Sequence, residues 1–183
     1  MIDPLPIGTS VAGRSDSMDA KDILTDAFGR LPGLVHSAVH GLTPEQLRWA
    51  PAPGANSIGW LIWHLTRVQD DHLADAMGAD QIYLTGDWPA RFGLKDDPSD
   101  TGYGHSASEV ATVAPESPQA LEDYYRAVHD RAMTYVAGLT DDDLDRVVDT
   151  AWDPPVTLGV RLVSVADDDA QHVGQAAYVR GLL

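Results

Sequence analysis

The segment from about residue 157 to 182 has apolar residues at helical spacing. Ionisable residues, among them Asp168 and His172, interrupt this apolar repeat near the middle of the segment. Asp168 and His172 are four residues apart, which places them on one face of a helix, one turn apart. The same predicted stripe contains Val165, Ala176 and Val179. An ionisable side chain in a packing stripe is costly unless it pairs or binds an ion. The fold must therefore supply a partner for both residues.

Two segments in the N-terminal half show the same helical repeat. The first runs from about residue 19 to 40, and Pro32 within it predicts a kink or break near Gly29. The second is predicted to begin at residues 56–57, either of which has a capping side chain, and to end before Gly78. Both segments therefore predict amphipathic helices that bury one face.

The C-terminal half contains a third predicted helix before the final one. It begins at Ser117-Pro118, a cap followed by proline at the first helical position, and ends at Gly138. One short helical turn is predicted at residues 140–144. Residues 146–156 contain two consecutive prolines, which exclude a helix and indicate an irregular or short extended crossing.

A long segment without helical periodicity, residues 78–117, separates the second predicted helix from the third. It is rich in Gly, Asp and Pro, and loops of this length in compact domains are usually functional or disordered. Because it contains Trp88, Phe92 and Tyr103, we expect it to pack against the body of the protein. Four helices with one long crossover between helices 2 and 3 predict an all-α four-helix bundle.

Length and composition narrow the remaining choices. The 183 residues are predicted to form one bundle domain, 19–183, preceded by an arm or tail at residues 1–18. The chain has no cysteine, which excludes disulfides, thiolate metal sites and a cysteine nucleophile. A net charge of −16 argues against nucleic acid and anionic membranes as partners. With no secretory signal or bilayer-length apolar run, we expect a cytoplasmic protein.

His64, in the apolar second helix, is the candidate third partner for Asp168 and His172. Two histidines and one carboxylate on helices that a bundle brings together are typical of a divalent-metal site with an open position, which suits zinc, iron or nickel. Alternatively, His64 is a core histidine that bonds to the backbone or to Asp71. The residues alone leave both interpretations open.

The other histidines are predicted to have simpler roles. His36 and His40 are also four residues apart, but they lie opposite the apolar stripe of their helix and near its C-terminal end. A surface position is predicted for both, because the helix dipole favours cations there. His72 and His129 are predicted at the boundary of the core, and His105 lies in the long loop, from which it can approach a pocket.

Four stretches of this sequence resemble the DinB-like superfamily, namely residues 60–68 (WLIWHLTRV), 152–162 (WDPPVTLGVRL), 168–175 (DDAQHVGQ) and 42–54 (LTPEQLRWAPAPG). The nearest branch by resemblance contains mycothiol-dependent maleylpyruvate isomerase and related actinobacterial thiol transferases. The resemblance covers roughly residues 20–183. It implies a DinB-like four-helix bundle that holds a divalent metal through three side chains.

By that resemblance, His64 matches the ligand on the second helix, and Asp168 and His172 match the carboxylate-x-x-x-His pair on the fourth. The family's metal is usually zinc, and nickel or iron also suit these ligands. The metal would lower the pKa of a bound low-molecular-weight thiol, with mycothiol as the thiol that the resemblance implies. The thiolate would then attack an electrophile, giving S-transfer or isomerisation.

Further expectations concern the thiol pocket and the partners. Trp60, Arg67, Asp71 and the loop of residues 88–105 are the candidates to shape the thiol pocket. The partners expected are a small-molecule thiol and an electrophile, and the resemblance implies a homodimer. The alternative is a non-catalytic dimeric protein of the same superfamily, in which the metal is structural or absent and the long loop contacts a partner.

Overall fold

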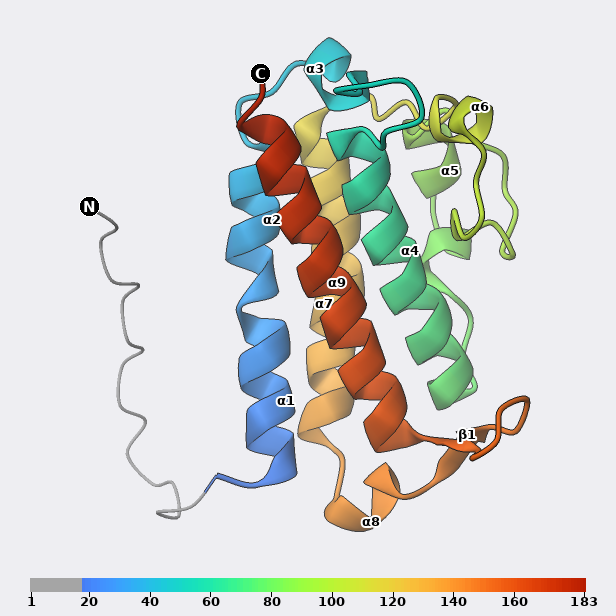
Figure 1. The fold of residues 1–183 in the computed structure, drawn as a ribbon. Helices are drawn as coiled ribbons and strands as arrows, with labels where there is room; N and C mark the ends of the chain where they lie inside the picture. The colour runs from blue at the N-terminus through green and yellow to red at the C-terminus, as the bar shows by residue number, and fades with distance from the viewer. Residues whose placement is uncertain (1–17) are drawn as a thin grey trace.

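The computed structural model describes residues 18–183, and the predicted arm at residues 1–18 lies outside the described residues except for its last residue. Five helices build the bundle, with α1 and α2 in line along one corner (Figure 1). Their bounds are α1 Ala20–Gly29, α2 Leu31–Val39, α4 Ile58–Met77, α7 Pro118–Ala137 and α9 Leu158–Arg180. The predicted all-α four-helix bundle is confirmed.

The first predicted helix is divided where the sequence indicated. α1 ends at Gly29, Arg30 lies between the helices, and Pro32 falls in the first turn of α2. Proline is tolerated there because the first N–H groups of a helix have no intrahelical acceptor. Arg30 therefore marks a real break between α1 and α2.

Capping side chains set the ends of the other long helices. The hydroxyls of Ser57, Ser117 and Thr157 accept hydrogen bonds from backbone N–H groups in the first turns of α4, α7 and α9. Gly78 ends α4 in the left-handed region, with φ of +63°, where a glycine pays no steric penalty. These boundaries agree with those predicted from the caps.

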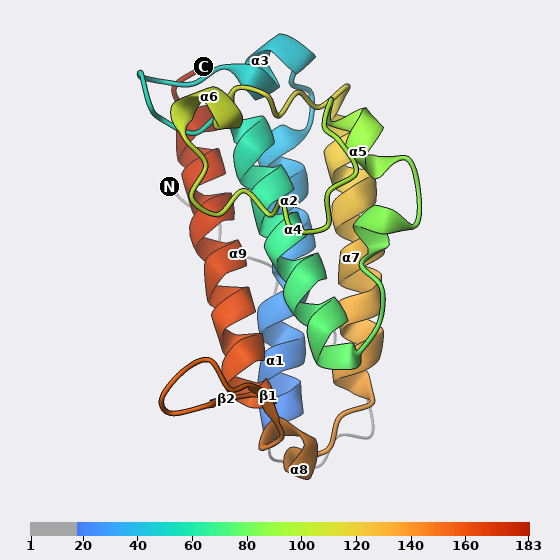
Figure 2. The same ribbon diagram turned by 90° about the vertical axis from the view of Figure 1, so that its right-hand side faces the viewer.

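The long crossover carries the chain back along the outside of the bundle, so α4 and α7 run in the same direction (Figures 1 and 2). It contains three short helical pieces that were not predicted: η1 (Ile82–Leu84), α5 (Trp88–Arg91) and α6 (Ala107–Val110). Tyr83 and Phe92 are buried, as expected for a segment that packs against the body. Tyr103 is 93% exposed, so the prediction was wrong for this aromatic residue.

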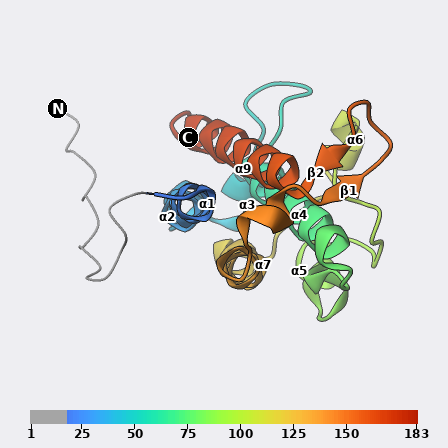
Figure 3. The same cartoon turned by 90° about the horizontal axis from the view of Figure 1, so that it is seen from below.

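The main helices occupy four corners when the bundle is seen end-on (Figure 3). α9 packs most extensively against α4 and also contacts α2, while α7 contacts α4, α1 and α2. The crossover helix α5 lies outside α4 and α7. This order places the facing surfaces of α4 and α9 directly against one another.

The remaining elements lie at the two ends of the bundle. α3 (Pro44–Arg48) precedes α4, and α8 (Asp141–Leu144) is the short turn predicted after α7. The predicted extended crossing is an antiparallel pair of β1 (Val147–Asp149) and β2 (Val156–Thr157), with Val147 opposite Thr157. Within residues 18–183, no helix combines the length and apolar character that a membrane crossing requires.

Candidate metal centre

The structure brings His64 of α4 next to Asp168 and His172 of α9, and we call these three residues the α4–α9 cluster. One potential ligand atom from each lies within 4.8 Å of the others. The ring centroids of His64 and His172 are 4.8 Å apart, and His172 Nε2 is 3.5 Å from Asp168 Oδ1. Residues more than one hundred positions apart therefore meet because α4 packs against α9.

Both imidazoles are oriented through Nδ1. The Nδ1 of His64 lies 2.5 Å from the Thr101 carbonyl oxygen, and the Nδ1 of His172 lies 3.0 Å from Gln175 Oε1. A carbonyl oxygen only accepts hydrogen bonds, so each Nδ1 carries the proton. Nε2 is then left as the electron-pair donor in the neutral ring. Metal-binding histidines are held in this way, with the other ring N–H donated to a carbonyl or carboxylate.

The electrostatics differ between the two histidines. Burial lowers the pKa of His64, which favours the neutral ring that a metal requires. The contact with Asp168 raises the pKa of His172, so a proton on Nε2 faces the carboxylate. A bound cation would take the place of that proton, because metal and proton compete for the same electron pair.

Asp168 supplies the observation that tests whether a cation fits. Its Oδ2 is buried and has no hydrogen-bond partner among residues 18–183. A buried carboxylate oxygen without a donor is costly, and a cation among the three donors would satisfy it. The residues present thus fit a divalent metal held by three side chains with an open position.

An aromatic wall supports the cluster on the side of the crossover. The ring of Trp60 stacks on His64 with centroids 4.5 Å apart, and its indole N–H donates to Nδ1 of His105 over 3.2 Å. The Nε2 of His105 lies 2.9 Å from Asp100 Oδ1, and its ring stacks on Trp63. His105 was predicted to approach a pocket from the long loop, and its ring lies against Trp60 and Trp63 beside the cluster.

Gly102 allows the loop backbone to approach the cluster. Its φ is +88°, and a Cβ at this position would lie 2.8 Å from the ring of Trp63 and 2.9 Å from Nδ1 of His64. Neither the conformation nor the space admits a larger residue. Neither Gly102 nor the carbonyl of Thr101 was predicted from the sequence to belong to the site. The pair Gly102-x-Gly104 was the available signal for a tight backbone turn.

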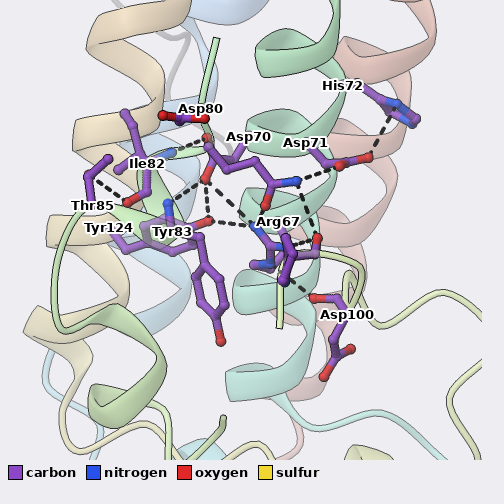
Figure 4. Close-up of polar contacts among 12 residues, drawn as sticks. Arg67, Asp70, Asp71, His72, Asp80, Ile82, Tyr83, Thr85, Asp100 and Tyr124 are labelled. Atoms are coloured by element: carbon purple, nitrogen blue, oxygen red, sulfur yellow. Dashed lines mark hydrogen bonds and ion pairs between the residues drawn. The ribbon is translucent and has the colours of Figure 1, made fainter. Parts of the chain in front are cut away.

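Arg67 anchors this loop from inside the protein (Figure 4). Its side chain is fully buried, its Nε donates to the Asp100 carbonyl over 3.0 Å, and one Nη donates to the Pro98 carbonyl over 2.9 Å. Its guanidinium also lies over the ring of Tyr83. Arg67 was predicted to shape a thiol pocket. The structure places it behind the loop that carries Thr101, so its effect on the site is indirect.

Asp70 is the buried counter-charge of this network and was not singled out from the sequence. Its carboxylate accepts hydrogen bonds from the backbone N–H groups of Ile82 and Tyr83 and from the Tyr124 hydroxyl (Figure 4). It also pairs with Arg131. These contacts join α4, the start of the crossover and α7. These donors offset the desolvation free energy that burial of a charged carboxylate costs.

Trp60 and Asp71 were also predicted to shape the pocket. Trp60 lies against His64, as described above. Asp71 is on the half-buried face of α4, where it accepts a hydrogen bond from Gln81 Nε2 over 2.7 Å (Figure 4). Its contact with Gln81 ties it to the same loop network as Arg67, since Gln81 also accepts from Arg67.

Asp169 corrects the expected orientation of the last helix. The predicted packing stripe passed through Asp168 and left Asp169 off the core-facing side, but Asp169 is fully buried, and neither of its carboxylate oxygens has a hydrogen-bond partner among residues 18–183. Burial raises its pKa well above the usual range, and Asp168 adds to this effect. The prediction was wrong because the core-facing line runs through Val165, Asp169 and Val173. This line is rotated by about one residue from the predicted stripe.

The remaining histidines divide between surface and core. His36 and His40 are exposed, as predicted. His72 lies at the boundary, where its ring contacts an Nη of Arg161 at 2.9 Å. His129 is more buried than predicted, since its ring stacks on Tyr125 within the core.

An open groove of about 460 Å³ adjoins the α4–α9 cluster. It is lined by Pro51, Ala55, Asn56, Leu61, Gly174, Gln175, Tyr178 and Val179. Gln175 connects the two features, because it lines the groove and accepts the hydrogen bond from His172. The groove has the size of a small-molecule site and a mostly apolar lining.

The fold and the three convergent donors define a helical-bundle protein with a candidate divalent-metal centre between two helices. The family model for the DinB superfamily matches residues 27–176. This chain therefore belongs to the DinB superfamily. No curated protein matches the sequence significantly.

Solved structures agree with this assignment. A conserved protein from Enterococcus faecalis superimposes with a TM-score of 0.81 and 31% identity over 90% of this chain and 96% of its own. YfiT from Bacillus subtilis is described as a probable metal-dependent hydrolase with an unusual four-helix bundle topology. It superimposes with a TM-score of 0.63 and 19% identity over 95% of this chain and 93% of its own. A DinB-like protein from Bacillus cereus superimposes with a TM-score of 0.51 and 20% identity over 85% of this chain and 83% of its own. The latter two likenesses concern the fold alone.

Proposed function

We propose that this protein is a metal-dependent enzyme that activates a low-molecular-weight thiol, such as mycothiol, for S-transfer or isomerisation. The observation that carries the proposal is the convergence of His64, Asp168 and His172, with an unpartnered buried oxygen on Asp168. The carboxylate-x-x-x-His order on α9 further supports the thiol-using branch, because the resemblance places this ligand pair there.

The two histidines and Asp168 would hold the metal, with zinc as the first candidate and nickel or iron as alternatives. A divalent metal at an open position lowers the pKa of a thiol bound to it, so that thiolate is available at neutral pH. The Thr101 carbonyl and Gln175 hold the imidazoles in the required orientation. Neither is itself a ligand, so both act through the histidines.

The surroundings suit a thiol and an electrophile brought from solution. The chain has no cysteine, so the reacting sulfur belongs to the small molecule. Trp60, which stacks on His64 and donates a hydrogen bond to His105, covers one side of the cluster and would limit access of water from the crossover. The groove beside Gln175 leaves room for an apolar part of a substrate on the side of α9.

Hydrolysis is the second candidate, because YfiT is described as a probable metal-dependent hydrolase. Three protein ligands with an open position also suit activation of water. The two reactions differ in what they consume. S-transfer consumes one thiol per turnover, and thiol-dependent isomerisation regenerates the thiol at the end of each turnover. Hydrolysis proceeds without a thiol.

The test uses untagged protein loaded with zinc, nickel or iron, with metal content measured by elemental analysis. Thiol binding is followed by calorimetry with mycothiol and glutathione, and turnover is screened against alkylating electrophiles and cis-dicarboxylic acids. We expect His172→Ala to lose one metal ion per chain and all thiol binding. Gln171→Ala, an exposed change one residue away on the same helix, is the matched control and should retain both.

Each result decides between the candidates. If His172→Ala keeps the metal content of the unsubstituted protein, the ligand assignment is wrong. Turnover of esters or amides without thiol would favour hydrolysis. Equal melting temperatures with and without chelator, together with no thiol binding, would favour the non-catalytic alternative.

A further inference from the structure

His36 of α2, His40 at the C-terminal cap of α2 and Glu122 of α7 form another group of potential metal ligands, which we call the α2–α7 cluster. One donor atom from each lies within 4.8 Å of the others. The two imidazole centroids are 4.5 Å apart, and Glu122 Oε2 lies 3.1 Å from Nδ1 of His36. From these contacts we propose that the α2–α7 cluster is a second divalent-cation site. It shares no residue with the α4–α9 cluster and is independent of the function proposed above.

The helical spacing of the histidines is the first support. His36 lies in the last turn of α2 and His40, four residues on, is the residue that caps it, so both imidazoles lie on the same side of the C-terminal end of the helix. The sequence alone indicated only a pair of surface histidines. Glu122 becomes their neighbour because α2 packs against α7, which turns a pair into a three-donor set from two helices.

The positions of the donors are held by the fold. The Glu122 side chain is only 13% exposed, although the side chain of His36 is 53% exposed. Arg180 of α9 donates hydrogen bonds to the carbonyl oxygens of Ala38 and His40, over 3.1 and 2.8 Å. These bonds fix the end of α2 that carries His40. The backbone is therefore anchored while the imidazole nitrogens remain accessible to an ion from solution.

The donor set selects the kind of ion. Two imidazole nitrogens and one carboxylate oxygen suit Zn²⁺, Ni²⁺ or Cu²⁺, whereas Ca²⁺ and Mg²⁺ prefer sites built from oxygen ligands. The α2–α7 cluster is at the surface, and the Arg180 guanidinium brings a positive charge to the same helix end. Both features weaken cation binding, so the site should bind less tightly than the α4–α9 cluster. A bound ion would link α2 to α7 and stabilise the fold by mass action.

The experiment titrates untagged full-length protein, stripped with chelator, with Zn²⁺ alone in a calorimeter. The unsubstituted protein should bind two equivalents of different affinity. The double variant His36→Ala/His40→Ala should lose the weaker equivalent and keep the tighter one, and His172→Ala should do the reverse. Ser37→Ala is the matched control, because this residue lies between the two histidines and bonds only to its own helix. It should retain both equivalents.

The proposal is overturned if the double variant binds as many equivalents of Zn²⁺ as the unsubstituted protein, whatever that number is. Circular dichroism establishes whether the double variant is folded. Glu122→Gln provides a second test, because it keeps the size of the side chain and removes the charge. It should raise the dissociation constant of the weaker equivalent. An unchanged constant would show that Glu122 is not a ligand and would also overturn the proposal.

Discussion

The α4–α9 and α2–α7 clusters offer the same ligands, two imidazoles and one carboxylate, yet their surroundings differ. In the α4–α9 cluster, both Nδ1 atoms are bonded to carbonyl-type oxygens, which leaves both Nε2 atoms as the candidate metal donors. In the α2–α7 cluster, the Nδ1 of His36 itself faces Glu122, and both rings are exposed. The comparison indicates that ligand type sets which ion can bind, while the surrounding hydrogen bonds and burial set how tightly it binds.

The loop of residues 98–105 illustrates this difference. The buried side chain of Arg67 holds the carbonyls of Pro98 and Asp100, and the next residue, Thr101, presents its carbonyl to His64. This support reaches from the buried Arg67–Asp70 network to His64, a candidate metal ligand. The α2–α7 cluster has Arg180 as its backbone anchor, but that contact holds α2 and does not orient either ring.

The largest effect is expected from Gly102→Ala. The added Cβ would clash with Trp63 and with Nδ1 of His64, displacing the loop and its Thr101 carbonyl. Metal binding at the α4–α9 cluster should weaken about 100-fold, the upper range for loss of an outer hydrogen bond. Unfolding free energy should fall by about 1–3 kcal/mol. Zinc titration and urea denaturation measure the two effects.

Gly104→Ala is the control for Gly102. Gly104 also has a positive φ, +76°, but its Cβ would meet open space. It should therefore show only the cost of backbone strain, about 1 kcal/mol or more, with metal affinity retained. Equal metal affinities for the two variants would show that the close approach of the loop does not support the cluster.

A smaller effect is expected from Gln175→Ala, which removes the acceptor for Nδ1 of His172. Metal affinity of the α4–α9 cluster should fall about tenfold, while that of the α2–α7 cluster stays constant. Gln171→Ala is the matched control, since Gln171 bonds only to Asp167 on the outer face of α9. If the two variants bind zinc equally, orientation of His172 by Gln175 is not what distinguishes the clusters.

The smallest effect concerns the buried carboxyl of Asp169 beside the α4–α9 cluster. Asp169→Asn should increase the free energy of unfolding by about 1 kcal/mol at pH 8, because the amide is neutral in the folded and the unfolded chain, whereas burial of Asp169 retains a proton that the unfolded chain releases. The folded pKa of Asp169 is raised, so above about pH 4 the unfolded chain releases this proton while the folded chain keeps it. The wild-type protein therefore loses stability as pH rises, and the advantage of the variant grows.

Urea denaturation at pH 5 and pH 8, with chelator present, measures this difference. Asp167→Asn is the control, because Asp167 is exposed on the same turn of α9 and its replacement should change stability by less than about 0.5 kcal/mol. A variant at position 169 that is no more stable than the wild-type protein at either pH would show that the fold satisfies Asp169 in some other way.

Much of this organisation could be predicted from local sequence. Ser57, Ser117 and Thr157 cap the helices at positions that their side chains define, and Gly78 ends α4 by its left-handed backbone. Such signals depend on neighbouring residues alone, so no tertiary contact is needed to detect them. The grouping of His64 with Asp168 and His172 required only helical periodicity and the packing of two predicted helices.

The burial of Asp169 could not be predicted from local sequence. Several of the apolar positions of α9 fit either of two neighbouring helical faces, and a rotation of about one residue decides whether Asp168 or Asp169 faces the core. Only the packing of α9 against α2 and α4 selects one face. The contact that orients His64 could not be predicted either. Its acceptor is a backbone carbonyl of the crossover, and every residue has a backbone carbonyl, so the residue type gives no sign of it.

The sequence by itself determined the helices, their ends, and the presence of two four-residue pairs that contain imidazoles, because these depend on local conformation and spacing. The tertiary structure brought a third donor to each pair: His64, which the sequence had indicated, and Glu122, which it had not. His64 joins Asp168 and His172 through the α4–α9 contact, and Glu122 joins His36 and His40 through the α2–α7 contact. The physical reason is that ligand geometry depends on distances between helices, which arise from the packing of the whole core.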